Sequence, residues 1–531
     1  MAELKYTPVE EIEKIQATLR NTFRSGKSKN IEYRKYQLLQ LAYMVKDNTQ
    51  RFQDALAADL GRPPFESQFL EIGSSIVEAR TAWANVDKWA KPEKPGFSIN
   101  STPMRPVIYK EPKGVVLIIS PFNYPMWLCM SPLAGAIAAG NAVVIKPAET
   151  APNVSALFAE LIPKYLDPEL VAVVNGGIPE TTRLLELPWD HILYTGGGRV
   201  ARIVSAAAAK HLTPVSLELG GKSPVFVDPN CDLETTAKRI MWGKVVNAGQ
   251  TCVAPDYVLV PRDFQDKFVN ALKEACDKFY PESVSTPGIY SRLITPQAFR
   301  RVKGLLDNTK GKVVFGGEAD EATKFIAPTV VKDCSFDDSL MSEEIFGPVL
   351  PVIPVENVEE AITYVNNNDH PLALYVFSRD DAYKQKVFSR TQSGAAIANE
   401  VVLHPGIEGL PFGGIGPSGS GYHTGKYSFD MFTHLRASMD TPSWIDRILG
   451  FRFPPYSDQS FKGASRLVKS LPPRPTGPPR VEAVNGSATR KWWGKWFILA
   501  FALTIAGGLT NRVKILGALM PVVYRGERVV G

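Results

Sequence analysis

The sequence predicts an α/β fold in which helices cover a parallel sheet. Four short runs rich in β-branched residues recur between residues 114 and 195, separated by helical or turn segments. Strands buried on both faces of a parallel sheet appear as continuous apolar runs of this kind. The runs are Val115–Ile119, Ala142–Ile145, Val171–Val174 and Ile192–Tyr194. Ligands of such sheets bind beyond the carboxyl ends of the strands, so the residues just past these runs are the first candidates for a site.

Length, charge and cysteine content narrow the class of protein. The 531 residues suffice for two or three domains with sizeable cores. Residues 441–531 hold 14 Lys/Arg and 4 Asp/Glu, so the net charge of +6 leaves residues 1–440 at −4. This acidic body argues against nucleic acid as a partner, and the basic tail points to an anionic surface. Five unpatterned cysteines indicate a reducing compartment and predict neither disulfides nor a metal site.

The amino-terminal stretch is predicted to be helical, and its polar opening predicts no signal peptide. Thr7 and Glu10 form a capping-box pattern around Pro8 at the first helical position. At residues 91–95 the sequence Lys-Pro-Glu-Lys-Pro breaks the pattern, which predicts an extended arm that leaves the domain and returns.

The segment Asn247–Cys252 sets a cysteine among groups suited to chemistry. A free cysteine is more often a small buried apolar residue than a nucleophile. Here Gly249 lets the backbone approach a ligand, and Gln250 and Thr251 place polar groups beside the sulfur. Glu218 precedes Cys252 by 34 residues and ends an apolar strand before two glycines. A carboxylate there can serve a thiolate nucleophile as its base.

Three segments follow the predicted strands. The first and the third have both a structural and a functional interpretation, and the second has only a structural one from its residues alone. Asn123 lies in a turn that opens a helix, or it donates its amide to an oxyanion. Lys146 is by itself only a solvated charge. Residues 195–198 offer a glycine-rich helix start for a pyrophosphate, although glycine runs are usually turns.

Glu-Leu-Gly-Gly-Lys at 218–222, followed by Gly-Gln-Thr-Cys at 249–252, resembles the aldehyde dehydrogenase superfamily. The resemblance extends from about residue 8 to Arg436 and is closest to class 3, which includes the fatty aldehyde dehydrogenases. Segments 174–182, 254–257 and 432–436 support that assignment. The family implies a Rossmann-like cofactor domain, a catalytic α/β domain, an oligomerisation β-arm and a homodimer.

The domain division implied by the resemblance has five parts. They are the cofactor domain (8–91 and 114–214), the catalytic domain (215–394), the oligomerisation and bridging elements (92–113 and 395–440), a linker (441–490) and a membrane-attached tail (491–531).

The resemblance implies oxidation of an aldehyde to its acid with NAD, or alternatively NADP, as cofactor. Cys252 attacks the carbonyl as a thiolate, and Asn123 and the Cys252 N–H hold the oxyanion. Hydride transfer leaves a thioester, and Glu218 activates the water that hydrolyses it.

Seven residues match the cofactor-binding motifs of the family. Lys146 and Glu149 bind the adenosine ribose, Thr195, Gly196 and Gly197 the phosphates, Glu344 the nicotinamide ribose, and Phe346 packs near the nicotinamide. For Glu344 the structural alternative is an acid that caps a turn before Gly347-Pro348. Gly197 and Ala201 replace the serine and glycine common in the family, which predicts weaker or more mobile cofactor binding.

The carboxyl-terminal tail differs from the body in composition. Leu471–Arg480 contains five prolines and predicts an extended linker. Basic residues and tryptophans at 490–495 then precede the apolar run Trp496–Leu509, a pattern typical of a membrane interface, and Ile515–Val523 adds a shorter apolar piece. The run is shorter than the roughly twenty residues that span a bilayer, which favours embedding over spanning.

The tail predicts a cytosolic catalytic body attached to the endoplasmic reticulum, the mitochondrial outer membrane or a lipid droplet. Medium- to long-chain fatty aldehydes are the expected substrates, because they partition into lipid. The alternatives are class 3-type oxidation of aromatic or short aldehydes, a CoA-acylating reductase, and a non-catalytic membrane scaffold. Glu218 argues against the reductase. The scaffold is disfavoured by the intact set of Cys252, Glu218, Asn123 and Glu344.

Overall fold

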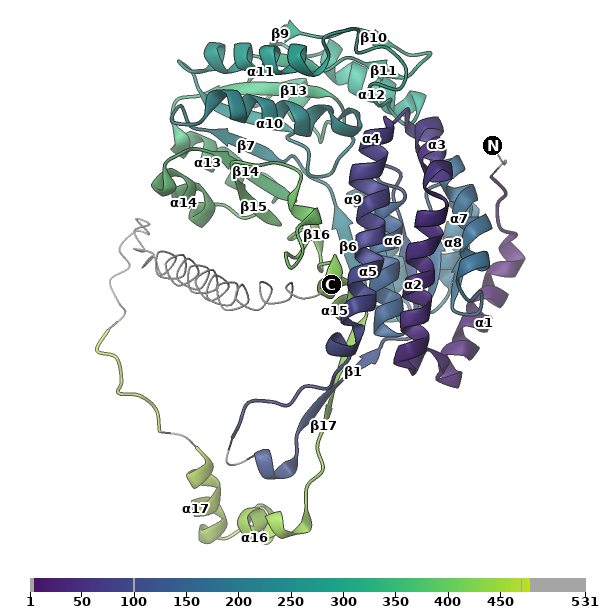
Figure 1. The fold of residues 1–531 in the computed structure, drawn as a ribbon. Coiled ribbons are helices and arrows are strands. Elements are labelled where there is room, and N and C mark those ends of the chain that lie inside the picture. The colour runs from purple at the N-terminus through teal and green to yellow at the C-terminus, as the bar shows by residue number, and fades with distance from the viewer. Residues whose placement is uncertain (1–3, 99–100, 469, 478–531) are drawn as a thin grey trace, which may run out of the picture. The chain divides into compact units, whose positions relative to one another are not determined.

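The computed structural model describes residues 4–98, 101–468 and 470–477, whose core is two parallel sheets (Figure 1). The six-stranded sheet has the order β16-β6-β5-β2-β3-β4, and the seven-stranded sheet has the order β15-β14-β7-β8-β13-β12-β9. Neighbouring strands in both sheets run parallel except at β16–β6 and β12–β9. The predicted α/β class is therefore confirmed.

The strands of the six-stranded sheet are β2 (Val115–Ile119), β3 (Ala142–Lys146), β4 (Val171–Val173), β5 (His191–Gly196), β6 (Val215–Leu219) and β16 (Gly419–Ser420). Those of the seven-stranded sheet are β7 (Pro224–Val227), β8 (Tyr257–Pro261), β9 (Lys312–Phe315), β12 (Thr329–Lys332), β13 (Val349–Val355), β14 (Ala373–Phe377) and β15 (Ala395–Ala398).

All four predicted strands are present, and β3, β4 and β5 end one or two residues away from the predicted position. Every residue of β2 and β3 is buried, which explains their uninterrupted apolar sequences. β5 continues to Gly196 because Thr195 and Gly196 pair with Glu218 and Leu219 of β6. Thr195 and Gly196 therefore end a strand, rather than opening the loop that the sequence predicted.

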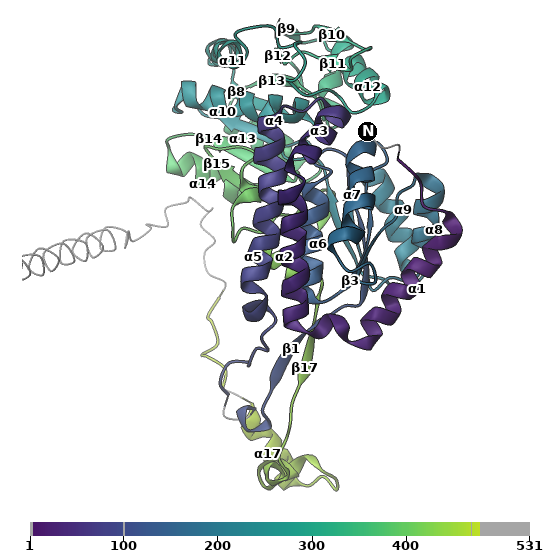
Figure 2. The same ribbon diagram turned by 45° about the vertical axis from the view of Figure 1, so that its right-hand side comes forward.

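Helices pack on both sheets (Figures 1 and 2). Around the six-stranded sheet they are α1 (Val9–Ser25), α2 (Ile31–Asp47), α3 (Thr49–Leu60), α5 (Gly73–Trp89), α6 (Trp127–Ala139), α7 (Pro152–Tyr165), α8 (Ile178–Glu186), α9 (Gly198–Ala209) and α15 (Gly425–Met431). Around the seven-stranded sheet they are α10 (Leu233–Val245), α11 (Gln265–Phe279), α12 (Pro296–Asp307), α13 (Val358–Asn366) and α14 (Asp381–Arg390). α5 packs between α2 and α6 and is joined to α3 by the short helix α4 (Pro64–Glu66) and a π-helical turn, Ser67–Ile72.

The buried apolar residues form two hydrophobic cores, and the segment after β2 contributes to the second although its strand lies in the first. The first core surrounds the six-stranded sheet and the second surrounds the seven-stranded sheet. Tyr124, Trp127 and Leu128 follow β2 in the chain but belong to the second core. The loop after β2 is thus fixed between the two sheets.

A two-stranded antiparallel arm lies outside both sheets (Figure 1). β1 (Val107–Pro112) pairs there with β17 (Thr433–Ser438). Past it, the short helices α16 (Asp446–Leu449) and α17 (Asp458–Leu467) occupy part of the expected linker, and α17 buries none of its residues. Within the described part of the chain, no helix is long and apolar enough to cross a membrane. The predicted tail at 491–531 lies outside the described residues.

The predicted capping box at the first helix is wrong. Pro8 is the N-cap residue of α1, and no side chain caps this end. The Thr7 hydroxyl instead accepts a hydrogen bond from the backbone N–H of Asn175, at 3.1 Å. A distant loop therefore takes the acceptor that the local sequence had assigned to the helix.

Candidate active site

A cavity of about 1000 Å³ opens at the carboxyl ends of β2, β3, β5 and β6. Loops from the second core complete its wall, including the segments that carry Cys252 and Glu344. The structure brings all ten predicted site residues to this cavity. They are Asn123, Lys146, Glu149, Thr195, Gly196, Gly197, Glu218, Cys252, Glu344 and Phe346.

Cys252 follows a loop whose backbone is held in unusual conformations. Asn247, Ala248 and Gly249 have φ values of 53°, 51° and 72°, three consecutive residues in the left-handed region. Only Gly249 adopts this conformation without cost, and a Cβ there would lie 2.2 Å from the carbonyl oxygen of Gly347. Strain of this kind persists only where the surrounding structure over-determines the backbone.

The thiol of Cys252 lies in a setting that disfavours its ionised form. Burial raises its pKa to about 12, and the negative charges of Glu344 and Glu218 add to the shift. The backbone N–H groups of Cys252 and Val253 oppose it. The sulfur is therefore protonated at neutral pH in this state, and another group must take its proton before it can act as a nucleophile.

Glu218 presents an uncompensated carboxyl group beside the cysteine. Its side chain is only 3% exposed, and among the described residues neither carboxylate oxygen has a hydrogen-bond partner. Burial raises its pKa well above the usual value. A buried carboxyl with free oxygens is costly for folding and points to a function.

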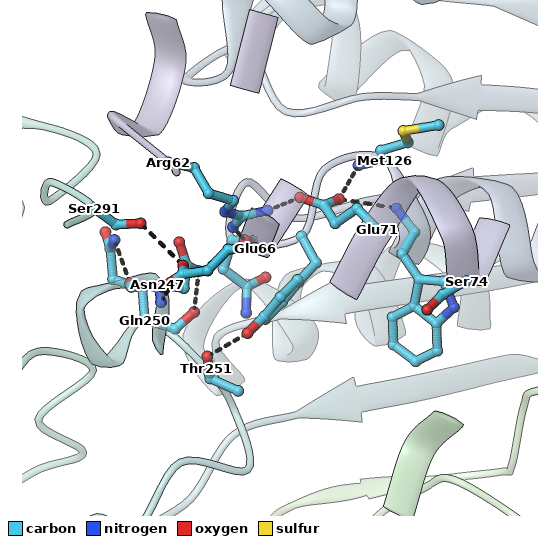
Figure 3. Close-up of polar contacts among 12 residues, drawn as sticks. Arg62, Glu66, Glu71, Ser74, Met126, Asn247, Gln250, Thr251 and Ser291 are labelled. Atoms are coloured by element: carbon cyan, nitrogen blue, oxygen red, sulfur yellow. Dashed lines mark hydrogen bonds and ion pairs between the residues drawn. The ribbon is translucent and has the colours of Figure 1, made fainter. Parts of the chain in front are cut away.

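Asn123 lies in the loop after β2 and is buried, and its backbone carbonyl accepts hydrogen bonds from two donors. The amide of Asn247 donates to this oxygen at 2.9 Å, and the guanidinium of Arg62 donates to it as well. Figure 3 shows the network to which Arg62 and Asn247 belong. Arg62 lies 61 residues from Asn123, and no local sequence signal identifies it.

The opposite end of the cavity carries charged groups and a helix start. Lys146 ends β3 and donates to the Glu149 carboxylate at 2.7 Å and to the Pro147 carbonyl at 2.9 Å. Gly197 is the N-cap residue of α9, and no side chain caps this helix. A Cβ at Gly197 would meet nothing within 4 Å, so space remains at this helix terminus.

The loop that carries Glu344 and Phe346 places the Glu344 carboxylate against the backbone at Gly220. A Cβ on Gly220 would lie 2.2 Å from a carboxylate oxygen of Glu344, so a larger residue there would displace the Glu344 side chain. Burial raises the pKa of Glu344 to about 8, and Asp256 contributes to the shift. The Phe346 ring packs edge-on against Phe122, with centroids 5.9 Å apart.

Two cations that the sequence did not identify as functional hold this loop in place. Lys222 donates to the Asp256 carboxylate at 2.6 Å and to the carbonyls of Leu340 and Glu343. Arg301 donates to the carbonyls of residues 344 and 345 at 3.0 and 2.6 Å. Lys222 lies within the Glu-Leu-Gly-Gly-Lys motif, which was the available signal, whereas Arg301 had none.

The cavity suits a dinucleotide at one end and a covalent thiol adduct at the other. The open N-terminus of α9 accepts an anionic group, and Glu149 and Glu344 are suitable acceptors for ribose hydroxyls. Beside them lie the Cys252 thiol and the Glu218 carboxyl, whose oxygens have no hydrogen-bond partner in the part of the chain that the structure describes. Within the described ranges, no group of three or more His, Cys, Asp or Glu residues is placed to hold a metal ion. Such a cavity is typical of a dinucleotide-dependent oxidoreductase.

The comparisons with known proteins identify the family. Residues 1–438 match the model of the aldehyde dehydrogenase family, and the chain belongs to this family. It is an NAD(P)-dependent enzyme that oxidises aldehydes.

Relatives and solved structures agree with this assignment. The chain is 44% identical to aldehyde dehydrogenase family 3 member A2 of Mus musculus over 84% of its length and 92% of that protein. It is also 44% identical to the dimeric NADP-preferring aldehyde dehydrogenase of Canis lupus familiaris, over 84% and 98%. A substrate-bound structure of Staphylococcus aureus AldH has a TM-score of 0.84 at 38% identity and covers 86% of this chain and 99% of its own.

Proposed function

We propose that Cys252, Glu218 and Asn123 carry out the aldehyde oxidation. Cys252, once deprotonated, attacks the aldehyde carbon, and the Asn123 amide and Cys252 N–H stabilise the developing oxyanion. The bound nicotinamide supplies the hydride acceptor. Glu218 then takes a proton from the water that hydrolyses the cysteine thioester. The observation that carries this proposal is the buried Glu218 carboxyl, which has no hydrogen-bond partner among the residues that the structure describes and lies in the same cavity as Cys252.

The other end of the cavity supports the proposed cofactor contacts. Lys146 and Glu149 bind the adenosine ribose, Thr195, Gly196 and Gly197 face the phosphates, and Glu344 and Phe346 hold the nicotinamide end. The six-stranded sheet then serves as the core of the cofactor domain and the seven-stranded sheet as that of the catalytic domain.

The proposed substrates are medium- to long-chain fatty aldehydes, with aromatic or short aldehydes as the alternative. The apolar run and basic residues in the carboxyl-terminal sequence support attachment to a lipid surface, where long-chain aldehydes accumulate. The catalytic body then lies in the cytosol. A homodimer is proposed because a 44% identical relative is named as dimeric and because the β1–β17 arm stands outside both sheets.

An aldehyde panel assayed on detergent-solubilised protein tests the activity and the substrate class. NADH formation should require Cys252, and kcat/KM should rise with aldehyde chain length. A preference for aromatic or short aldehydes would contradict the fatty substrate class and leave the oxidation itself intact. A protein that binds NAD but oxidises none of the aldehydes would support the scaffold alternative.

Removal of residues 490–531 tests the membrane tail separately. The truncated enzyme should be soluble and should still oxidise short aldehydes, because the described site contains no residue from this segment. The loss of activity on truncation should increase with chain length. Full-length protein that remains in the soluble fraction on fractionation would contradict the tail as an anchor.

A further inference from the structure

A fully buried ion pair lies directly behind the loop that carries Asn123. The side chains of Arg62 and Glu71 are both 0% exposed, and they bond to each other. Pro63 and Pro64 follow Arg62 and fix the backbone where α3 gives way to α4. The π-helical turn that includes Glu71 comes next, and such turns occur frequently at functional sites.

The two residues of the ion pair bind the two ends of the short loop from Asn123 to Trp127. Arg62 donates to the carbonyl of Asn123 at the start of this loop. At its end, the Glu71 carboxylate accepts the backbone N–H groups of Met126 at 2.7 Å and Trp127 at 3.0 Å. Since α6 begins at Trp127 without a side-chain cap of its own, Glu71 caps that helix from a distant segment (Figure 3).

The same carbonyl of Asn123 also holds the loop that leads to Cys252. The side-chain amide of Asn247 donates to the Asn123 carbonyl and to the Gln250 carbonyl, each at 2.9 Å. The backbone N–H of Asn247 donates to Glu66 at 3.0 Å, in the helix that follows Arg62. Tyr124 and Thr251 join their hydroxyls at 2.7 Å, which forms a second bridge between the two loops.

The geometry of the Arg62–Glu71 pair indicates that it positions the Asn123 loop rather than simply stabilising the fold. A buried ion pair is often no more stabilising than apolar residues of the same volume. Among the described residues the Nε of Arg62 has no hydrogen-bond partner, so the pair is not fully satisfied. A planar guanidinium can bind a carboxylate and a carbonyl at once, in fixed directions, whereas a lysine ammonium has no fixed fork.

We propose that Arg62 and Glu71 are positioning residues, which fix the Asn123 amide relative to Cys252 by clamping both ends of the Asn123–Trp127 loop. The inference rests on the proposed function, in which Asn123 stabilises the oxyanion. Loss of the clamp displaces the oxyanion donor, whereas the loop of Cys252 keeps the bonds from Asn247 to Glu66 and to the Gln250 carbonyl. Reactions that pass through an oxyanion should therefore become slower, and other reactions of the thiol should not.

Three reactions of Cys252 separate these effects. Aldehyde oxidation and acylation by p-nitrophenyl acetate both require attack on a carbonyl and form an oxyanion, and the ester releases p-nitrophenolate without the cofactor. Alkylation by iodoacetamide displaces iodide from carbon and forms no oxyanion. Arg62→Lys and Glu71→Gln should slow the first two reactions by a similar factor, about tenfold or more. Alkylation should change by less than about twofold.

Asn123→Ala and Arg34→Lys serve as reference variants. Asn123→Ala alone should slow acylation by about 10²–10³-fold, and adding Arg62→Lys should cause no further loss if Arg62 acts through Asn123. Arg34 is likewise a buried arginine that donates to backbone carbonyls, those of Ser28 at 2.7 Å and Ala138 at 3.1 Å. Arg34→Lys should leave all three reactions unchanged.

The outcomes distinguish this inference from the proposed function. Additive losses in the double variant, a parallel fall in alkylation, or wild-type acylation by Arg62→Lys would each overturn the positioning role. If Arg62→Lys fails to fold, Glu71→Gln alone decides, since Gln keeps an acceptor for the N–H groups at 126 and 127. If Asn123→Ala itself acylates normally, the proposed oxyanion role fails.

Discussion

The nucleophile end of the cavity is held far more tightly than the end where α9 begins. Asn247 and Ala248 have left-handed backbone conformations, and hydrogen bonds join their loop to Asn123 and Glu66. Gly197, in contrast, has an ordinary φ of −79°, no capping side chain and open space around its Cβ position. Groups that act on a reacting carbon need a fixed geometry. Binding of a phosphate needs mainly backbone N–H groups that point at it and the positive end of a helix dipole.

Substitution of the proposed nucleophile should produce the largest effect. Cys252→Ala should abolish turnover, because the only sulfur in the motif is lost, and should leave cofactor binding nearly unchanged at the other end of the cavity. Steady-state NADH formation and NADH fluorescence titration measure the two properties. Dehydrogenase activity equal to that of the wild type would remove Cys252 from the mechanism.

Replacing the proposed base should slow one chemical step selectively. Glu218→Gln should lower the steady-state rate by about 10²–10⁴-fold, because only hydrolysis of the thioester requires the carboxylate in this role. Rapid mixing with a chromogenic aldehyde should show a burst of NADH followed by a slow steady state. Equal slowing of both phases would argue against Glu218 and make Glu344 the next candidate.

A matched pair of glycine substitutions compares the two ends directly. Gly249→Ala should destabilise the protein by about 1–3 kcal/mol or more and impair catalysis, since φ is 72° and the Cβ would meet the Gly347 carbonyl at 2.2 Å. Gly197→Ala should have an effect within about 0.5 kcal/mol, because its backbone is ordinary and its surroundings are open. Chemical denaturation of both variants is the measurement, and equal losses would contradict the comparison.

The stability of the cofactor-free enzyme should depend on pH through Glu344. Its folded-state pKa of about 8 lies above the ordinary value of 4.5, so the unfolded chain loses this proton first as the pH rises. Stability is therefore lost between about pH 4.5 and 8, by at most about 1.4 kcal/mol per pH unit. Glu344→Gln removes this loss, so its advantage in Tm over the wild type should be larger at pH 8 than at pH 5. A pH-independent difference would show that Glu344 does not hold its proton.

Serine at residue 197 should have the smallest effect. The open space there accommodates a hydroxyl, which can cap α9 and donate to a phosphate. Gly197→Ser should therefore bind NADH a few-fold more tightly, as measured by fluorescence titration. Weaker binding would mean that the glycine is itself required by the cofactor.

The sequence by itself determined four strands of the six-stranded sheet, β2 to β5, and ten residues that the structure brings to the cavity. Runs such as Val115–Ile119 are apolar because both faces of the sheet are covered, and that cause acts on the local sequence. The motifs around Glu218 and Cys252 are local as well, since each is a strand end or a tight loop whose glycine has a steric reason, at Gly220 and Gly249.

Only the tertiary structure decided which charges and carbonyls meet. Arg62 donates to the carbonyl of Asn123, 61 residues away, and Arg301 donates to the carbonyl of Glu344. The Thr7 hydroxyl accepts a hydrogen bond from Asn175 in a distant loop instead of capping its own helix. A buried polar group must find a partner, but the sequence does not state which one, because the partner is set by how helices and loops pack. The proposed reacting residues are therefore visible in the sequence, and those that hold them in place appear only once the chain is folded.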